Sequence, residues 1–138
     1  MIVADTNIVS EFMKGSPDQA VLRWARTLAP DEMTITVVTV EEIERGLARL
    51  PLGRRRSDLE SRWQVLLDAY ADGVLPYDLP AARETARIAA ARFDIGCPIS
   101  LADAQIAGIS VTGAAVLATR NTKDFEHIDG LRLLNPFG

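Results

Sequence analysis

Four acidic residues of this 138-residue chain follow predicted strands or begin predicted helices: Asp5, Glu42, Asp103 and Asp124. Asp5 comes directly after the apolar run Ile2–Ala4, which predicts a short buried strand. Asp124 follows a predicted strand that ends near Ala118. In a parallel α/β sheet the carboxyl ends of the strands share one edge, where ligands bind. The four carboxylates are therefore expected to converge there.

Each acid also has a purely structural interpretation. Asp5-Thr6-Asn7 has the composition of a helix cap. Thr39 to Glu42 and Ser100 to Asp103 have the spacing of capping boxes, which would place Glu42 and Asp103 in the first turn of a helix. Asp124 suits an Asx turn. Spacing alone does not separate four caps from one shared site.

Four carboxylates brought together repel one another, and a hard divalent cation relieves that repulsion. An all-oxygen set without Cys or His favours Mg²⁺ or Mn²⁺ over zinc. The only histidine, His127, is predicted to lie on the surface. Such a cation activates water and stabilises a leaving oxygen, as phosphodiester hydrolysis requires.

Short apolar runs alternate with amphipathic segments along the whole chain. Strands are predicted at residues 2–4, 33–38, 74–77, 115–118 and 131–134, and helices at 8–13, 18–28, 39–50, 54–70, 80–93 and 100–113. This alternation predicts a three-layer α/β/α fold around a parallel sheet. No linker interrupts residues 1–138, so a single domain is expected.

Composition narrows the class of protein. The net charge of -4 provides no overall basic field for nucleic acid. A single cysteine, Cys97, fits a reducing cytoplasm and is interpreted as a structural or loop residue. The N-terminus lacks the pattern of a signal peptide, and the most apolar run, Ile106–Thr119, is too short to span a membrane.

Local basic residues offer contacts for phosphate. Arg54-Arg55-Arg56 is the densest basic run; a solvated helix start is the favoured explanation, and a phosphate contact for RNA is the alternative. Arg120, close to Asp124 in sequence, is the better candidate for a substrate phosphate, because arginine pairs with phosphate bidentately. Trp24 and Trp63 follow helical stripes and are expected in the core or an interface.

Four motifs in order carry a family resemblance. They are Val3–Asn7, Thr39–Gly46, Ser100–Ala107 and Leu117–Phe125, and the chain closes on Asn135–Phe137. This set, which runs from end to end, resembles PIN-domain ribonucleases, and among them the VapC and FitB-type toxins of bacterial type II toxin–antitoxin pairs. Asp-Thr-Asn alone would be a weak signal, but the ordered set is strong.

The resemblance implies a sheet of strand order 3-2-1-4-5 and a pocket that binds Mg²⁺ or Mn²⁺ and cleaves RNA. Matched motif by motif, it assigns catalysis and metal binding to Asp5, Glu42, Asp103 and Asp124. It leaves Thr6 as a hydrogen-bonding residue near the metal and Asn121 as an organiser of the loop. Some relatives have Asp at the position of Asn121, so whether Asn121 or Asp124 is the closer ligand stays open. The implied partner is an antitoxin, a small DNA-binding protein.

Two other functions compete with the toxin interpretation. One is a PIN nuclease of RNA processing that has no antitoxin. The other is a non-catalytic Mg²⁺-binding α/β signalling module, but Asp5 lacks the adjacent second acid expected there. A phosphatase of the Asp-x-Asp type fails because Asn7 occupies the second position.

The small residues around Ala86–Ala89 further predict close helix packing and a homodimer.

Overall fold

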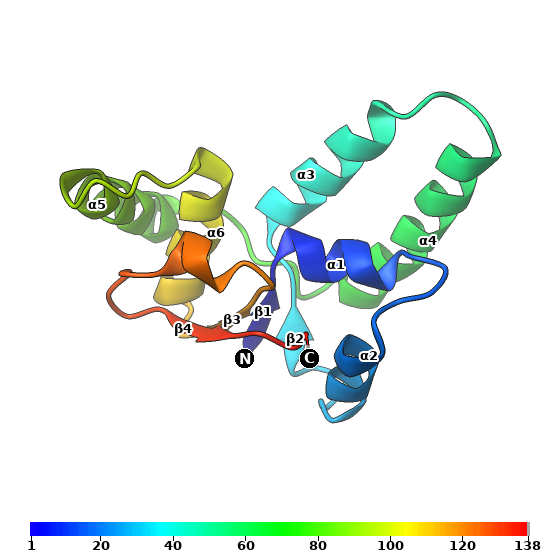
Figure 1. Ribbon diagram of the computed structural model, residues 1–138, viewed down its shortest axis with the longest axis horizontal. Coiled ribbons are helices and arrows are strands. Elements are labelled where there is room, and N and C mark those ends of the chain that lie inside the picture. The colour runs from blue at the N-terminus through cyan, green and yellow to red at the C-terminus, as the bar shows by residue number, and fades with distance from the viewer. Residues whose placement is uncertain (138) are drawn as a thin grey trace.

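The computed structural model describes residues 1–137, and its centre is a parallel sheet of order β2-β1-β3-β4 (Figure 1). The strands are β1 (Ile2–Ala4), β2 (Met33–Thr34), β3 (Val116–Ala118) and β4 (Arg132–Leu134). Strand β1 is central, and the chain moves from it to β2 on one side and later to β3 on the other. The carboxyl end of β1 is therefore the topological switch point, where open α/β sheets bind ligands.

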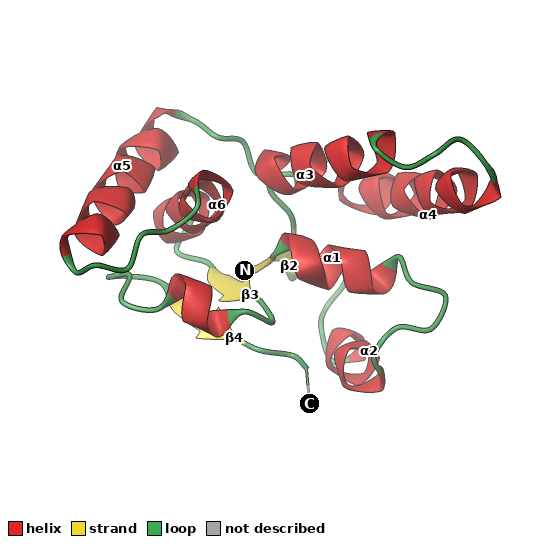
Figure 2. Cartoon of the chain, turned by 45° about the horizontal axis from the view of Figure 1, so that its top comes forward, coloured by secondary structure: helices red, strands yellow, loops and turns green. Residues whose placement is uncertain are grey.

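Within residues 1–137, six α-helices and one 3₁₀ helix surround the sheet (Figure 2). They are α1 (Thr6–Phe12), α2 (Gln19–Arg26), α3 (Val37–Ala48), α4 (Arg54–Tyr70), α5 (Leu79–Asp94), α6 (Leu101–Thr112) and η1 (Thr122–Phe125). Helices α5 and α6 lie together at one side of the molecule, and α3 and α4 form a hairpin at the other (Figure 1).

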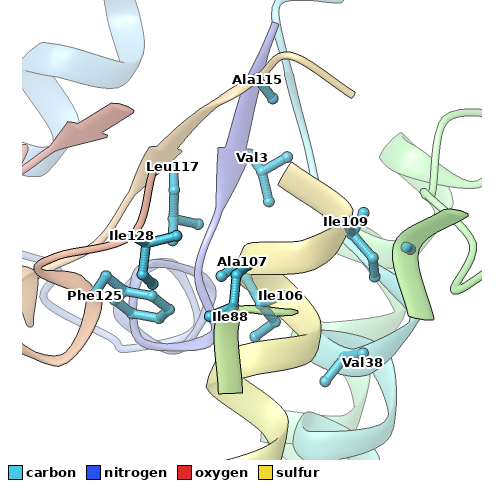
Figure 3. Packing of buried hydrophobic residues seen from close by; sticks show 11 residues of the cluster. Val3, Val38, Ile88, Ile106, Ala107, Ile109, Ala115, Leu117, Phe125 and Ile128 are labelled. Carbon is cyan, nitrogen blue, oxygen red and sulfur yellow. The ribbon is translucent and has the colours of Figure 1, made fainter. Parts of the chain in front are cut away.

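The sheet separates two hydrophobic cores because the side chains of each strand alternate between its faces. Val3 and Leu117 pack with Ile106 and Phe125 on the side of α5 and α6 (Figure 3). Ile2 and Ala4 belong to the second core, which contains residues of α1, α3 and α4. The predicted three-layer α/β/α fold is confirmed. Trp63, 4% exposed, belongs to the second core, as its helical stripe predicts.

Two predicted strands are shorter than expected. The strand predicted at residues 33–38 is reduced to Met33–Thr34, and the one at 74–77 to a single parallel bridge between Leu75 and Thr36. The sheet thus has four strands among the described residues, but the bridge keeps the segment at 74–77 beside β2, in the predicted order. Val37 and Val38 enter a helix despite their β propensity, because propensity is weaker than packing.

The start of α3 corrects the predicted capping box. Thr36, not Thr39, is the N-cap, and its hydroxyl accepts the backbone N–H of Thr39 at 3.2 Å. The first turn of α3 therefore begins three residues earlier than expected, and Glu42 lies in the second turn. The prediction for Ser100 is confirmed, since its hydroxyl accepts the backbone N–H of Asp103.

Helix α5 buries a different face from the predicted one. Its buried residues are Ala81, Thr85, Ile88 and Arg92, whereas Phe93 is 74% exposed. Close packing does occur on the buried face: a Cβ placed on Gly108 of α6 would stand 2.3 Å from Thr85 Oγ1. The small residues at Ala86 and Ala89 lie on the exposed face instead.

Among the described residues, none of the helices has the length and apolar character needed to cross a membrane.

Candidate active site

A cavity of about 280 Å³ opens at the carboxyl edge of the sheet, and all four predicted acids line it. The cavity also includes the two supporting residues expected from sequence, Thr6 and Asn121. Asn7 and Ser10, on the first turns of α1, complete its wall. Residues more than a hundred positions apart thus meet because the parallel strands end at one edge.

Asp5 is the most buried of the four acids, with 4% of its surface exposed. It follows β1 and caps α1: the backbone N–H of Thr6 donates to Asp5 Oδ1 at 2.7 Å. The Thr119 hydroxyl, at the end of β3, donates to Asp5 Oδ2 at 2.8 Å. The backbone N–H of Asp5 in turn donates to the carbonyl of Ala118. Asp5 is therefore held by its own helix and by the neighbouring strand.

Glu42 reaches the same cavity from α3. The Thr6 hydroxyl donates to Glu42 Oε1 at 2.6 Å and stands 3.1 Å from the buried Thr39 hydroxyl. Thr6 thus connects the first turn of α1 with the second turn of α3. A hydroxyl at this position fixes the direction in which Glu42 points.

Asp103 and Asp124 approach from α6 and η1. Buried Arg92 of α5 joins these elements, because its guanidinium donates to three backbone carbonyls: Cys97 at 2.7 Å, Asp124 at 2.8 Å and Glu126 at 3.1 Å. The contacts tie the segment that carries Asp124 to the end of α5, while the loop that leads into α6 is held at Cys97. The position of Asp124 thus depends on a residue outside the cavity.

The acids influence one another electrostatically. Burial raises the pKa of Asp5 from 3.8 to about 6; the hydrogen bonds from Thr119 and Thr6 oppose the shift, and the charges of Asp103 and Glu42 add to it. Burial also raises the pKa of Asp103, against the hydrogen bond with Ser100, and the charges of Asp124 and Glu42 contribute further. The Arg92 guanidinium partly lowers the same pKa.

This donor set fits a hard divalent cation. It consists of carboxylate, hydroxyl and amide oxygens, the ligands that Mg²⁺ and Mn²⁺ prefer. Within residues 1–137 no three acidic, histidine or cysteine side chains already stand in a group that holds one ion. The four carboxylates share a cavity rather than a completed coordination shell. Asp5 nevertheless has a free lone pair on each oxygen, since a carboxylate accepts at about four sites.

The basic candidates take different places. The Arg120 guanidinium lies 4.4 Å from the centre of the Phe137 ring, and its backbone N–H donates to Asn7 Oδ1 at 3.3 Å. Arg120 thus borders the cavity through Asn7 without lining it. His127 is exposed, as expected, and so is Cys97.

Thr119 and Arg92 are the functional neighbours that the sequence did not reveal. Thr119 is fully buried and joins Asp5 to the backbone N–H of Asn121, which donates to its hydroxyl at 3.1 Å. Its place directly after a strand end was the available signal, because that edge is where ligands bind. Arg92 left no comparable signal, because its partners are carbonyls of distant residues.

Comparisons with known proteins agree with the geometry. The PIN domain family matches residues 2–131. The chain is 40% identical to VapC ribonuclease Y4jK of Sinorhizobium fredii, over 99% of this chain and 98% of the relative. It is 32% identical to the tRNA(fMet)-specific endonuclease VapC of Shigella flexneri, over 93% and 92%. The solved structure of FitAB bound to an IR36 DNA fragment superposes with a TM-score of 0.91 at 32% identity, covering 100% of this chain and 96% of that one.

Replacing Asp5 with asparagine is predicted to stabilise the metal-free protein at neutral pH. The folded protein keeps a proton on Asp5 up to a pKa of about 6, against 3.8 for the ordinary residue. The contribution of Asp5 to stability is thus complete at low pH and is lost as pH rises through this window. Asparagine removes the buried charge and still caps α1, so Asp5→Asn should gain about 1–3 kcal/mol above the window.

Urea unfolding in EDTA, followed from about pH 4 to pH 7, checks this. The free energy of unfolding of Asp5→Asn should nearly equal that of the wild type at the acidic end of this range and exceed it increasingly toward neutral pH. Asp72→Asn, an exposed aspartate outside the cavity, provides the matched control and should leave the curve unchanged. A variant that is destabilised at every pH would contradict the analysis of Asp5.

Proposed function

Since the chain belongs to the PIN-domain family, among relatives of the VapC and FitB type, we propose that it is a divalent-metal-dependent endoribonuclease and the toxin of a toxin–antitoxin pair. The observation that carries the proposal is the cavity in which Asp5, Glu42, Asp103 and Asp124 meet at the switch point of the sheet. RNA is the proposed substrate because related proteins are named as a ribonuclease and as a tRNA-specific endonuclease.

The four acids would hold Mg²⁺ or Mn²⁺, which supplies an activated water and stabilises negative charge on a phosphodiester. Asp5 is the fixed member, since Thr6 and Thr119 orient both of its oxygens. Glu42 is oriented by the Thr6 hydroxyl, and the Asp124 segment by Arg92. Arg120 is proposed to contact a substrate phosphate with a guanidinium edge while its face remains on Phe137.

A signalling module of the receiver type is the less favoured alternative. Asn7 lines the cavity where such a module would supply a second acid next to Asp5. Nuclease chemistry uses all four carboxylates, whereas the alternative leaves Asp124 and Glu42 without a role. A PIN nuclease of RNA processing without an antitoxin keeps the same site and differs only in its partner.

The exposed free Cys97 is compatible with the reducing cytoplasm, where we expect the reaction to occur.

RNA cleavage should require both the cation and the acids. Labelled mixed RNA incubated with Mg²⁺ or Mn²⁺ should be cut by the wild-type protein and left intact in EDTA. Asp5→Asn and Asp103→Asn should each reduce the rate by about a hundredfold or more, because several kcal/mol of transition-state stabilisation are lost. Asp72→Asn is the control that retains activity. Equal cleavage by Asp5→Asn and wild type would overturn the proposed site.

An apolar groove next to the acids supports inhibition by an antitoxin segment. It has a volume of about 290 Å³, shares Thr6, Ser10 and Glu42 with the acidic cavity and continues over Met13 and Leu47. We propose that an antitoxin segment lies in this groove and places Arg or Lys near Asp5 and Asp103, because guanidinium forks onto carboxylates. Phe12, although adjacent to Met13 in sequence, does not line the groove but a separate hollow with Leu66 and Tyr70. Related FitAB and VapBC proteins were solved as complexes.

A complex with the cognate antitoxin should therefore cleave RNA at least about tenfold more slowly than the free protein and bind Mn²⁺ more weakly. Gly46 provides the test, because it lines the groove and a Cβ there meets nothing within 4 Å. Gly46→Phe should fill the groove and weaken the complex, whereas Ala48→Phe on the exposed face of α3 should not. A complex that cleaves RNA as fast as the free toxin would exclude this mode of inhibition.

We also propose that the protein is a homodimer formed through the exposed face of α5. Phe93, which is 74% exposed, follows Ala86 and Ala89 on the exposed face of α5. Ile95 at the C-cap of α5 and Leu101 at the start of α6 are also exposed, at 55% and 71%. Exposed apolar side chains that gather in this way are typical of protein interfaces.

Sedimentation should show a dimer at tens of micromolar, in the range of about 1 μM to 1 mM over which ordinary associations form. Phe93→Asp should give a monomer because it buries an unpaired charge in the interface. Val65→Asp, at an equally exposed apolar site on α4, should remain dimeric. A monomeric wild-type protein at this concentration would reject the interface.

A further inference from the structure

A basic hollow lies beyond the apolar groove, between the end of α1 and the start of α4. Its volume is about 480 Å³, and it is lined by Lys14, Gly15, Arg54, Arg55, Asp58, Leu59 and Arg62. Four of these residues are cations and one is an acid, in a chain whose net charge is -4. The hollow is therefore a local exception to the charge of the molecule.

The arginine side chains at and around the hollow differ in the protein groups that they contact. Arg56 is turned to the protein: it donates to the carbonyl of Leu50 at 3.2 Å and pairs with Glu60 at 3.4 Å. Arg62 uses one donor for the carbonyl of Met13, at 3.0 Å. Arg54 and Arg55 are exposed and form no ion pair with any residue of the described chain. Two guanidinium groups thus face the hollow without a protein partner.

The hollow continues the route that begins at the acids. The acidic cavity and the apolar groove share Thr6, Ser10 and Glu42, and the groove and the hollow share Leu59. Helix α1 runs alongside, from Thr6 at the acids to its C-cap Met13 in the groove, and at about 1.5 Å per residue these ends lie roughly 10 Å apart. Lys14, the next residue, lines the hollow. A nucleic-acid strand held at the acids can follow this path over a few nucleotides.

We propose that the basic hollow binds backbone phosphates of the RNA strand whose scissile phosphate lies in the acidic cavity. This inference rests on the proposed nuclease function and extends it to the path of the substrate. A net charge of -4 with four acids at the reaction centre repels RNA, so binding requires a compensating basic surface close by. Arg54 and Arg55 provide this surface, since guanidinium groups pair with phosphate bidentately and phosphate contacts supply much of the affinity for nucleic acid. An acidic protein segment is the competing occupant.

Salt dependence of RNA binding tests the hollow directly. The probe is a fluorescein-labelled single-stranded RNA of about 12 nucleotides, measured by anisotropy in EDTA between about 50 and 200 mM KCl. Arg54→Ala/Arg55→Ala should weaken binding about tenfold and reduce the slope of log K against log salt by about 1.4, at about 0.7 per phosphate contact. Its melting temperature should stay equal or rise, because arginine in the first turn of α4 opposes the helix dipole.

The double variant Arg83→Ala/Arg132→Ala removes the same charge from exposed sites on α5 and β4 and should keep the wild-type slope. An equal loss of RNA affinity in both double variants, or no loss in either, would overturn the proposal. A labelled oligoglutamate of the same length forms the second arm. If it binds as tightly as RNA and depends equally on Arg54 and Arg55, the hollow is a docking surface for protein. The binding assay does not depend on cleavage. A protein that does not cleave RNA but shows the expected salt dependence of RNA binding would therefore contradict the proposed nuclease function and still support the phosphate site.

Discussion

Burial of the Asp5 carboxylate is the constraint around which the structure is arranged. A charge at 4% exposure is unfavourable unless it is hydrogen-bonded, and the residue lies where the central strand must end. The fold supplies the first turn of α1 on one side and Thr119 on the other. One donor comes from the helix that follows β1 and the other from the residue after β3, so the pairing of β1 with β3 is itself a condition for keeping this carboxylate in place. The raised pKa of Asp5 records the unfavourable interaction that remains.

The other acids reach Asp5 through contacts that span the sequence. Thr6 directs Glu42 across from α1 to α3, and Arg92 holds the backbone of Asp124 from α5. Arg92 is itself a buried charge that forms no ion pair within residues 1–137, and its guanidinium donates to three carbonyl groups. Its positive charge also favours the ionised form of Asp103. The side of the sheet that carries α5 and α6 therefore contributes to the site both sterically and electrostatically.

The site was more predictable than the elements that carry it. Asp5 and Asp103 were placed correctly because their signals are local: an apolar run before one, and a capping serine before the other. Glu42 reached the cavity although its helix begins at Val37, since one additional turn still points it to the same edge. The strand predicted at 74–77 became one bridge, because pairing depends on tertiary neighbours that propensity does not contain. The role of Arg92 depends on carbonyl groups of residues distant in the sequence. The run at Arg54 divides because Arg56 alone turns to Leu50 and Glu60, which the composition of the run does not indicate.

The order of chemistry along α1 constrains how activity and inhibition can coexist. Acidic, apolar and basic surfaces follow one another, and each shares wall residues with the next. A flexible polyanion can contact the basic end directly and the acidic end through a bound cation, and can cross the apolar stretch with its bases, which tolerate apolar surroundings. A peptide with apolar and basic residues fits the apolar stretch and the acids, but its positive charge is repelled by Arg54 and Arg55 at the far end. The two occupants therefore overlap at the acids and the apolar surface while differing at the basic end. An inhibitor of this form excludes the substrate by competition, without any change in the fold.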